Sequence, residues 1–252
     1  MGVLVLMYHR TPREAGHLLD VAMPLFRSQI QTLQASGVRF IRFGETLDRR
    51  WYGVDTVVSV TFDDGHGSNL EAMAFLHDAG IPSTSFFVSD FVRHGLDGFM
   101  DLAMFKAASA LCEVGAHGAS HTALTNLGPD ALAAELSTSK AYLEDLSGGA
   151  VTTLSAPGGM MNRRVVHTAL KLGYEVVGDS VALLNTAPSL PLHRICLLNG
   201  QSPEFVLSLL RAGPLYWLYQ RLRRTSGSVA ARLLGEERLR RVQRTFKGDR
   251  PA

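Results

Sequence analysis

The chain has 252 residues and a mass of 27.4 kDa, enough for one large domain or two small ones with a sizeable core. Hydrophobic residues make up 46% of the sequence and charged residues 19%, a composition that excludes a disordered chain. The formal net charge is +2, but residues 201–252 contain 11 Lys and Arg against 4 Asp and Glu, so the first 200 residues are net acidic, which argues against a nucleic-acid-binding main domain.

Strand patterns alternate with helical patterns along most of the chain. Short β-rich runs predict strands at Val3–Tyr8, Val38–Phe43, Val57–Phe62, Ser83–Val88, Glu113–Ala116, Val151–Leu154 and Tyr174–Val177. Helices are predicted between them, around Phe26–Leu33, from Asn69 to Gly80, and at Phe99–Leu111, Pro129–Leu146 and Val165–Leu172. This alternation predicts an α/β fold with a mainly parallel sheet, either open or closed into a barrel.

The pattern changes near Ser202, after which it is only helical. We therefore expect a main domain over residues 1–200 and a basic helical extension over residues 201–252. The aromatic run from Leu215 to Tyr219 is followed by arginines, a combination typical of a helix at an anionic membrane surface. The alternative is a helix that packs on the main domain with a solvated basic face.

Polar residues follow four of the predicted strands. They are His9, the pair Asp63 and Asp64, His117 with His121 four residues later, and the turn Ser155–Gly159. The carboxyl ends of parallel strands meet at one rim of a barrel, where catalytic residues gather. We therefore expect these side chains to lie close together.

Asp64, His117 and His121 are candidates for a three-ligand metal site. One carboxylate oxygen and two imidazole nitrogens leave coordination positions open for water and substrate, as a catalytic zinc site requires. Two histidines spaced by four residues converge on one ion from a helical turn or a tight loop. The alternative is that both histidines are solvated loop residues.

Asp63 is a candidate general base. Adjacent residues of an extended backbone point in different directions, so Asp64 can bind a metal while Asp63 faces the substrate side. An ordinary acidic turn is the alternative, because Asp-Asp-Gly is common in loops. The buried strand before it favours a functional role, since charges beside a core are costly.

Three segments resemble the motifs of the polysaccharide deacetylase family, which is also called the NodB-homology family or carbohydrate esterase family 4. Thr61–Gly65 resembles the first motif, Glu113–His121 the second, and Ser155–Gly159 the third. Their order and spacing agree with the family, and the similarity covers about residues 3–200. The resemblance implies a distorted (β/α) barrel of about seven parallel strands, and metal-dependent removal of acetyl groups, mostly from amino sugars.

The resemblance also implies roles for individual residues. Asp63 is the expected general base, and Asp64, His117 and His121 are the expected metal ligands, with zinc as the expected ion. The ion polarises the acetyl carbonyl and acidifies its bound water, and Asp63 takes a proton from that water.

The third motif is expected to bind substrate through the turn formed by Pro157, Gly158 and Gly159. The backbone N–H of Gly158 is the expected partner of the metal in holding the oxyanion. Gly158 stands where the family has an aromatic residue, which opens the floor of the pocket.

Two further departures from the family pattern concern polar side chains. Gly118 replaces the Ser or Thr of the second motif, which removes a hydroxyl but no ligand. Ser155 stands where the third motif has an arginine that usually pairs with the base. Arg163 and Arg164 are candidates to replace that arginine.

The general acid is expected to be a histidine outside the three motifs. The family's acid usually lies in a late Leu-x-x-His strand, but the corresponding position here is Asn199. The N-terminal segment Leu6–His9 resembles that strand moved to the front, which favours His9. His193 is the alternative, and a missing acid is the third possibility.

These observations predict a metal-dependent N-deacetylase of an amino sugar that is free, lipid-linked or polymeric. The alternatives are a hydrolase of small or cyclic amides on the same scaffold, and a barrel that binds carbohydrate without catalysis. The N-terminal segment reads as a strand, and two cysteines are too few for a disulfide framework. We therefore expect a cytoplasmic protein, with possible contact between its basic extension and the inner face of the membrane.

Overall fold

A seven-stranded sheet forms the centre of the molecule. The computed structural model describes residues 2–53, 55–213 and 216–217. The strand order is β6-β5-β4-β3-β2-β1-β7, and every neighbouring pair is parallel. The strands are β1 (Val3–Tyr8), β2 (Val57–Phe62), β3 (Ser83–Phe87), β4 (Glu113–Ala116), β5 (Thr153–Ser155), β6 (Val176–Gly178) and β7 (Ile195–Cys196).

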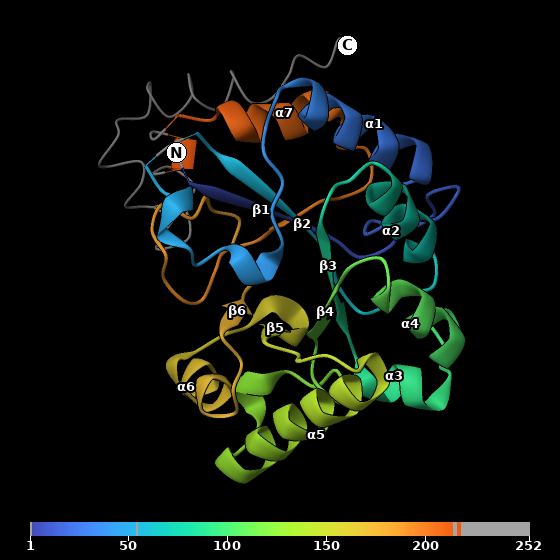
Figure 1. Ribbon diagram of the computed structural model, residues 1–252, viewed down its shortest axis with the longest axis vertical. Helices are drawn as coiled ribbons and strands as arrows, with labels where there is room; N and C mark the ends of the chain where they lie inside the picture. The colour runs from blue at the N-terminus through green and yellow to red at the C-terminus, as the bar shows by residue number, and fades with distance from the viewer. Residues whose placement is uncertain (1, 54, 214–215, 218–252) are drawn as a thin grey trace. The chain divides into compact units, whose positions relative to one another are not determined.

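Helices surround the strands (Figure 1). Those that connect successive strands are α1 (Met23–Ala35), α2 (Asn69–Asp78), α3 (Ser89–His94), α4 (Leu102–Ser109), α5 (Pro129–Ser147) and α6 (Arg163–Lys171). Local sequence sets their ends: Asp101 caps α4 by accepting from the Met104 N–H, and Gly148 ends α5 in the left-handed conformation at φ 69°. The long helix predicted from Pro129 is confirmed.

The two edges of the sheet approach each other. β7 pairs with β1, and Leu192, three residues before β7, forms a parallel bridge with Gly178 at the end of β6. The segment from Leu192 to Cys196 therefore contacts both edges, and the sheet curls into a distorted barrel. The predicted fold class, a (β/α) barrel of about seven parallel strands, is confirmed.

Hydrophobic side chains fill one end of the barrel. β1 and β2 are buried along their whole length, in agreement with their nearly continuous apolar sequences. Phe43, in a short 3-10 helix (Phe43–Glu45), packs edge-on against Phe86 of β3 with ring centroids 5.2 Å apart. The same apolar cluster contains the first residues of β1, β2 and β6, which are Val3, Val57 and Val176, so the amino ends of these strands are filled by apolar side chains.

The strand predicted at Val38–Phe43 is wrong. Only Phe40 forms an isolated bridge, to Val58 of β2. From Val60 onward the same edge of β2 is taken by β3, so the segment cannot continue along it. It turns instead into the 3-10 helix that carries Phe43.

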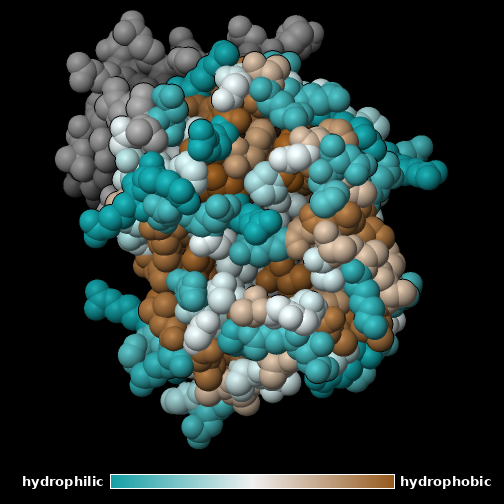
Figure 2. Space-filling view, in the orientation of Figure 1, coloured by the Kyte–Doolittle hydropathy of each residue, from teal (hydrophilic) through white to brown (hydrophobic). Residues whose placement is uncertain are grey.

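The chain divides into two compact units, Met1–Leu207 and Ser208–Ala252, and the division falls inside α7 (Pro203–Arg211). Most of the predicted basic extension, residues 218–252, lies outside the described residues. Among those that are described, no helix is both long and apolar enough to cross a membrane. On the face shown in Figure 2, hydrophobic side chains occur in patches among hydrophilic ones.

Candidate active site

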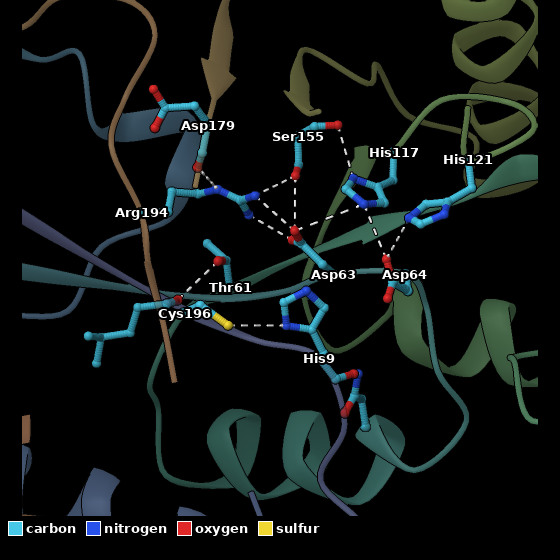
Figure 3. A network of polar contacts seen from close by, with 12 residues as sticks. His9, Thr61, Asp63, Asp64, His117, His121, Ser155, Asp179, Arg194 and Cys196 are labelled. Carbon is cyan, nitrogen blue, oxygen red and sulfur yellow. Dashed lines mark hydrogen bonds and ion pairs between the residues drawn. The ribbon is translucent and has the colours of Figure 1, made fainter. Parts of the chain in front are cut away.

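Side chains from the carboxyl ends of four strands meet in one polar cluster (Figure 3). His9 follows β1, Asp63 and Asp64 follow β2, and His117 follows β4. Ser155 ends β5. The expectation that these residues lie together rested on the parallel order of the strands, and the structure brings them together.

Asp64, His117 and His121 form a compact group of possible metal ligands. Asp64 Oδ1 lies 3.2 Å from the Nε2 atom of each histidine, and the two imidazole centroids are 5.1 Å apart. One ligand atom from each residue lies within 4.8 Å of the other two. This separation is short enough for one ion to contact all three.

The hydrogen bonding of His117 suits a metal ligand. Its Nδ1 atom lies 3.0 Å from the carbonyl oxygen of Ser155, which can only accept, so Nδ1 carries the proton. Its Nε2 atom therefore presents a lone pair toward Asp64. An imidazole whose far nitrogen donates to a carbonyl is the usual arrangement at metal sites, so these residues fit a divalent ion.

Backbone strain is concentrated at two of these residues. Among the described residues, Asp64 at φ 69° and His121 at φ 63° are the ones other than glycine with positive φ. This conformation is uncommon for residues with a Cβ and costs of order 1 kcal/mol or more. The strained backbone aims both side chains at the same point.

Asp63 is held on the other side of the cluster by an arginine. Arg194 Nη1 donates to Asp63 Oδ1 at 2.7 Å, and Nη2 donates to Oδ2 at 2.8 Å. Ser155 Oγ donates to Oδ2 at 3.1 Å and accepts from Arg194 Nη2 at 2.6 Å. All three side chains are almost completely buried. The carboxylate of Asp63 is therefore fixed in position.

The same contacts keep Asp63 ionised. Burial alone would raise the pKa of this carboxyl group, but the charge of Arg194, with its hydrogen bonds to the carboxylate, outweighs it. The net result is a pKa below the usual value. For Asp64, burial again opposes ionisation, and the adjoining side chains of His117 and His121 lower the pKa well below the usual range.

Arg194 is the residue that the sequence analysis missed. It lies one residue before β7, inside the barrel, where its Nε atom donates to the carbonyl oxygen of Asp179 at 2.9 Å. Arg163 and Arg164, the predicted replacements, are exposed on α6, and Arg164 donates to loop carbonyls instead. The sequence offered one signal for this role, which is that Arg194 stands directly before the short apolar run Ile195–Leu198.

The predicted substrate-binding turn lies beside the second motif. Pro157, Gly158 and Gly159 form a 3-10 turn in which both glycines have positive φ, at 65° and 68°. A Cβ built on Gly159 would lie 1.7 Å from Ser180 Oγ, so this position requires glycine. Gly158 is exposed.

The two predicted candidates for the general acid lie in different surroundings. His9 is in the cluster, with Nδ1 3.6 Å from Cys196 Sγ, and burial lowers its pKa. His193 directly precedes Arg194 and lies on the side of the cluster where Figure 3 shows Asp179. There it contacts Asp179, with its Nδ1 3.1 Å from Oδ2.

Comparison with known protein families agrees with the geometry of the site. The sequence model of the polysaccharide deacetylase family matches residues 53–177, which include the aspartate pair, both histidines and the third-motif turn. Residues 53–177 belong to the polysaccharide deacetylase family. Membership supports a hydrolase that removes acetyl groups from carbohydrates, and a divalent metal at the site.

Solved structures of deacetylases share the fold. The Streptococcus pyogenes deacetylase PplD, solved with acetate, superposes with a TM-score of 0.76 at 22% identity, over 83% of this chain and 98% of PplD. IcaB from Ammonifex degensii gives 0.73 at 23% identity, over 83% and 97%. The Bacillus cereus polysaccharide deacetylase BC0361 gives 0.73 at 23% identity, over 83% and 69%. No curated protein matches the sequence.

Proposed function

We propose that this deacetylase is a metal-dependent hydrolase that removes the N-acetyl group from an amino sugar and releases acetate and a free amine. The observation that carries the proposal is the convergence of Asp64, His117 and His121 on one point, with the ionised Asp63 held beside them. Hydrolysis of an unactivated amide requires these two elements, a Lewis acid and a base.

Asp64, His117 and His121 would hold the ion, and zinc is the ion that one oxygen and two imidazole nitrogens favour. When bound, the ion would supply Lewis acidity that polarises the acetyl carbonyl and lowers the pKa of a water molecule. Ser155 supports this site twice, through its carbonyl at His117 and its hydroxyl at Asp63.

Asp63 would take the proton from the attacking water. Its low pKa keeps it ionised at neutral pH, and Arg194 and Ser155 hold its two oxygens so that little reorganisation accompanies proton transfer. The turn at Pro157, Gly158 and Gly159, in which Gly158 is exposed, would bind the substrate. The backbone N–H of Gly158 would donate to the oxyanion as it forms.

His9 would protonate the leaving amine. It follows β1 and lies in the same cluster as both aspartates, whereas the imidazole of His193 contacts the carboxylate of Asp179. In our proposal His9 is therefore the general acid. His9→Ala is expected to keep metal binding and to lower kcat by about 100-fold or more, the usual range for loss of general-acid catalysis.

Acetate release from a panel of acetylated amino sugars tests the proposal. The panel contains free, lipid-linked and oligomeric forms, and each is measured before chelation, after chelation and after zinc is restored. Asp63→Asn is the matched control, because it removes the base and leaves the three expected ligands intact. Activity that survives chelation, or zinc binding without acetate release from any member, would contradict the proposal. The second result would favour a small-amide hydrolase or a non-catalytic carbohydrate-binding barrel.

The cytoplasmic location and the membrane contact of residues 201–252 stay predictions from the sequence. Co-sedimentation with anionic liposomes, for the full chain and a chain that ends near residue 212, tests the membrane contact. Equal sedimentation of the two chains would contradict it.

A further inference from the structure

The proposed acid His9 has a sulfur atom at its far ring nitrogen. Cys196 Sγ lies 3.6 Å from His9 Nδ1. The pairing of β1 with β7 explains the contact, because Met7 and Cys196 are register partners. His9 is two residues beyond Met7, so its side chain lies on the same face of the sheet as that of Cys196. The contact is therefore a product of the sheet that closes the barrel.

A second contact of the sulfur is compatible with a hydrogen bond from His9 to Cys196. The thiol of Cys196 can donate to the carbonyl oxygen of Leu197, at 3.8 Å, which leaves a sulfur lone pair for His9. In this arrangement the Nδ1 atom of His9 carries a proton and donates a hydrogen bond to the sulfur. Figure 3 shows the other ring nitrogen of His9 on the side of Asp63 and Asp64. That nitrogen, Nε2, is left to exchange protons in the site.

We propose that Cys196 is a positioning residue, which holds His9 in the tautomer that keeps Nδ1 protonated and directs Nε2 at the reaction centre. This inference rests on the proposed function of His9 as the acid. When the amide C–N bond breaks, its electron pair stays on the amine nitrogen and takes the proton from Nε2. The imidazolium becomes neutral and keeps the Nδ1 proton on the sulfur side.

A thiol differs from a carboxylate in this position because it orients the ring without adding charge. Burial raises the pKa of Cys196 to about 11, so the sulfur is a neutral thiol at physiological pH. The charged and titratable groups that face His9 are Asp63, Asp64, Arg194 and His117. Burial lowers the pKa of His9 more than the charges of Asp63 and Asp64 raise it, so the pKa lies below its usual value.

The tautomer of His9 is measured by ¹⁵N NMR of histidine-labelled protein at a pH where the ring is neutral, with the signal assigned by its loss in His9→Gln. The wild type is expected to show the Nδ1–H tautomer, and Cys196→Ala is expected to lose that preference. Cys112→Ala is the matched control, because Cys112 is a half-buried thiol elsewhere in the fold, where it donates to the carbonyl of Ala108. It is expected to leave His9 unchanged.

Kinetics on an active substrate separate positioning from a packing role. Cys196→Ala is expected to lower kcat by about 10-fold, as changes behind a functional histidine commonly do, with KM changed less than about twofold. Cys196→Ser keeps an acceptor and is expected to recover part of kcat. Cys196→Asp adds a negative charge, and is expected to raise the pKa of His9 measured by NMR.

The NMR result is independent of turnover, so it stands or falls separately from the proposed deacetylase activity. A wild-type ring in the Nε2–H tautomer would overturn the inference, even if Cys196→Ala does not fold. An unchanged tautomer in a folded Cys196→Ala protein would overturn it as well. Failure of every sugar to release acetate would instead count against the proposed function.

Discussion

Arg194 and Asp63 form a two-bond ion pair inside the barrel, although 131 positions separate them in the chain. Arg194 also lies over the ring of Phe86, with its guanidinium carbon 5.2 Å from the ring centroid. Both charges are removed from water, so each one depends on the other for compensation. The pair thus links the proposed base to the segment that joins the two edges of the sheet.

A double-mutant cycle on this pair is the first prediction. Arg194→Met is expected to lower the free energy of unfolding by about 3–5 kcal/mol, because it leaves a buried carboxylate unpaired. Combining it with Asp63→Asn is expected to recover part of that loss, since the neutral amide no longer requires a cation. Urea unfolding of the two single variants and the double variant measures the coupling. Additive effects of the two substitutions would contradict a direct dependence.

The second prediction concerns metal binding. His117→Ala is expected to weaken zinc binding by more than about 100-fold. Removal of a residue that only hydrogen-bonds to a metal ligand commonly costs about 10- to 100-fold in affinity, and removal of the ligand itself should cost more. Isothermal titration calorimetry on chelator-treated protein measures it. His193→Ala is the matched control, because His193 also lies beside an aspartate, Asp179, which is not one of the expected ligands. Equal loss of affinity in both variants would place the ion elsewhere.

The candidate metal ligands could be predicted from the sequence because each is close in the chain to a recognisable strand. Asp64 directly follows the apolar run of β2, and His117 directly follows β4. Parallel strands bring such positions to one rim by geometry alone. The sequence pattern did not show whether these side chains point at one another. The positive φ of Asp64, which orients its side chain, could not be predicted from it.

Arg194 could not be predicted because its role depends on long-range closure. β7 has only two residues, too few for a periodic signal. The position of Arg194 follows from the bridge between Gly178 and Leu192 and from the pairing of Leu6 with Ile195. Neither contact can be predicted from the local sequence, because each joins residues that are far apart in the chain or lie outside a recognisable strand. The failed strand at Val38–Phe43 has a similar cause, since β3 occupies the edge of β2 that it would need.

The third prediction concerns the pH dependence of stability. Glu113, at the start of β4, accepts hydrogen bonds from the Thr84 hydroxyl and the Gly44 N–H. Burial, the dominant cause, raises its pKa above the ordinary value of 4.5. A raised pKa means that the folded state prefers the neutral acid. Its stabilising contribution is therefore complete below the unfolded pKa and is lost as the pH rises through the folded pKa.

Glu113→Gln keeps the acceptor oxygen and removes the titration. The melting temperature of this variant minus that of the wild type is expected to rise as the pH increases from about 4, and to level off above the folded pKa of Glu113. Thermal unfolding of both proteins between about pH 4 and pH 8 measures the difference. A difference that stays constant over this range would show that Glu113 does not titrate with a raised pKa.

The last prediction tests the strained backbone at His121. His121→Ala and His121→Gly both remove the imidazole and its contact with Asp64, and they differ only by a Cβ at φ 63°. The free energy of unfolding of the glycine variant is expected to exceed that of the alanine variant by about 1 kcal/mol. The reason is that the left-handed conformation costs a residue with a Cβ about this much. Urea unfolding of metal-free protein measures the difference, and zinc titration should show both variants equally weakened. An alanine variant as stable as the glycine variant would mean that the loop relaxes without the imidazole, and that the strain at this position depends on the His121–Asp64 contact.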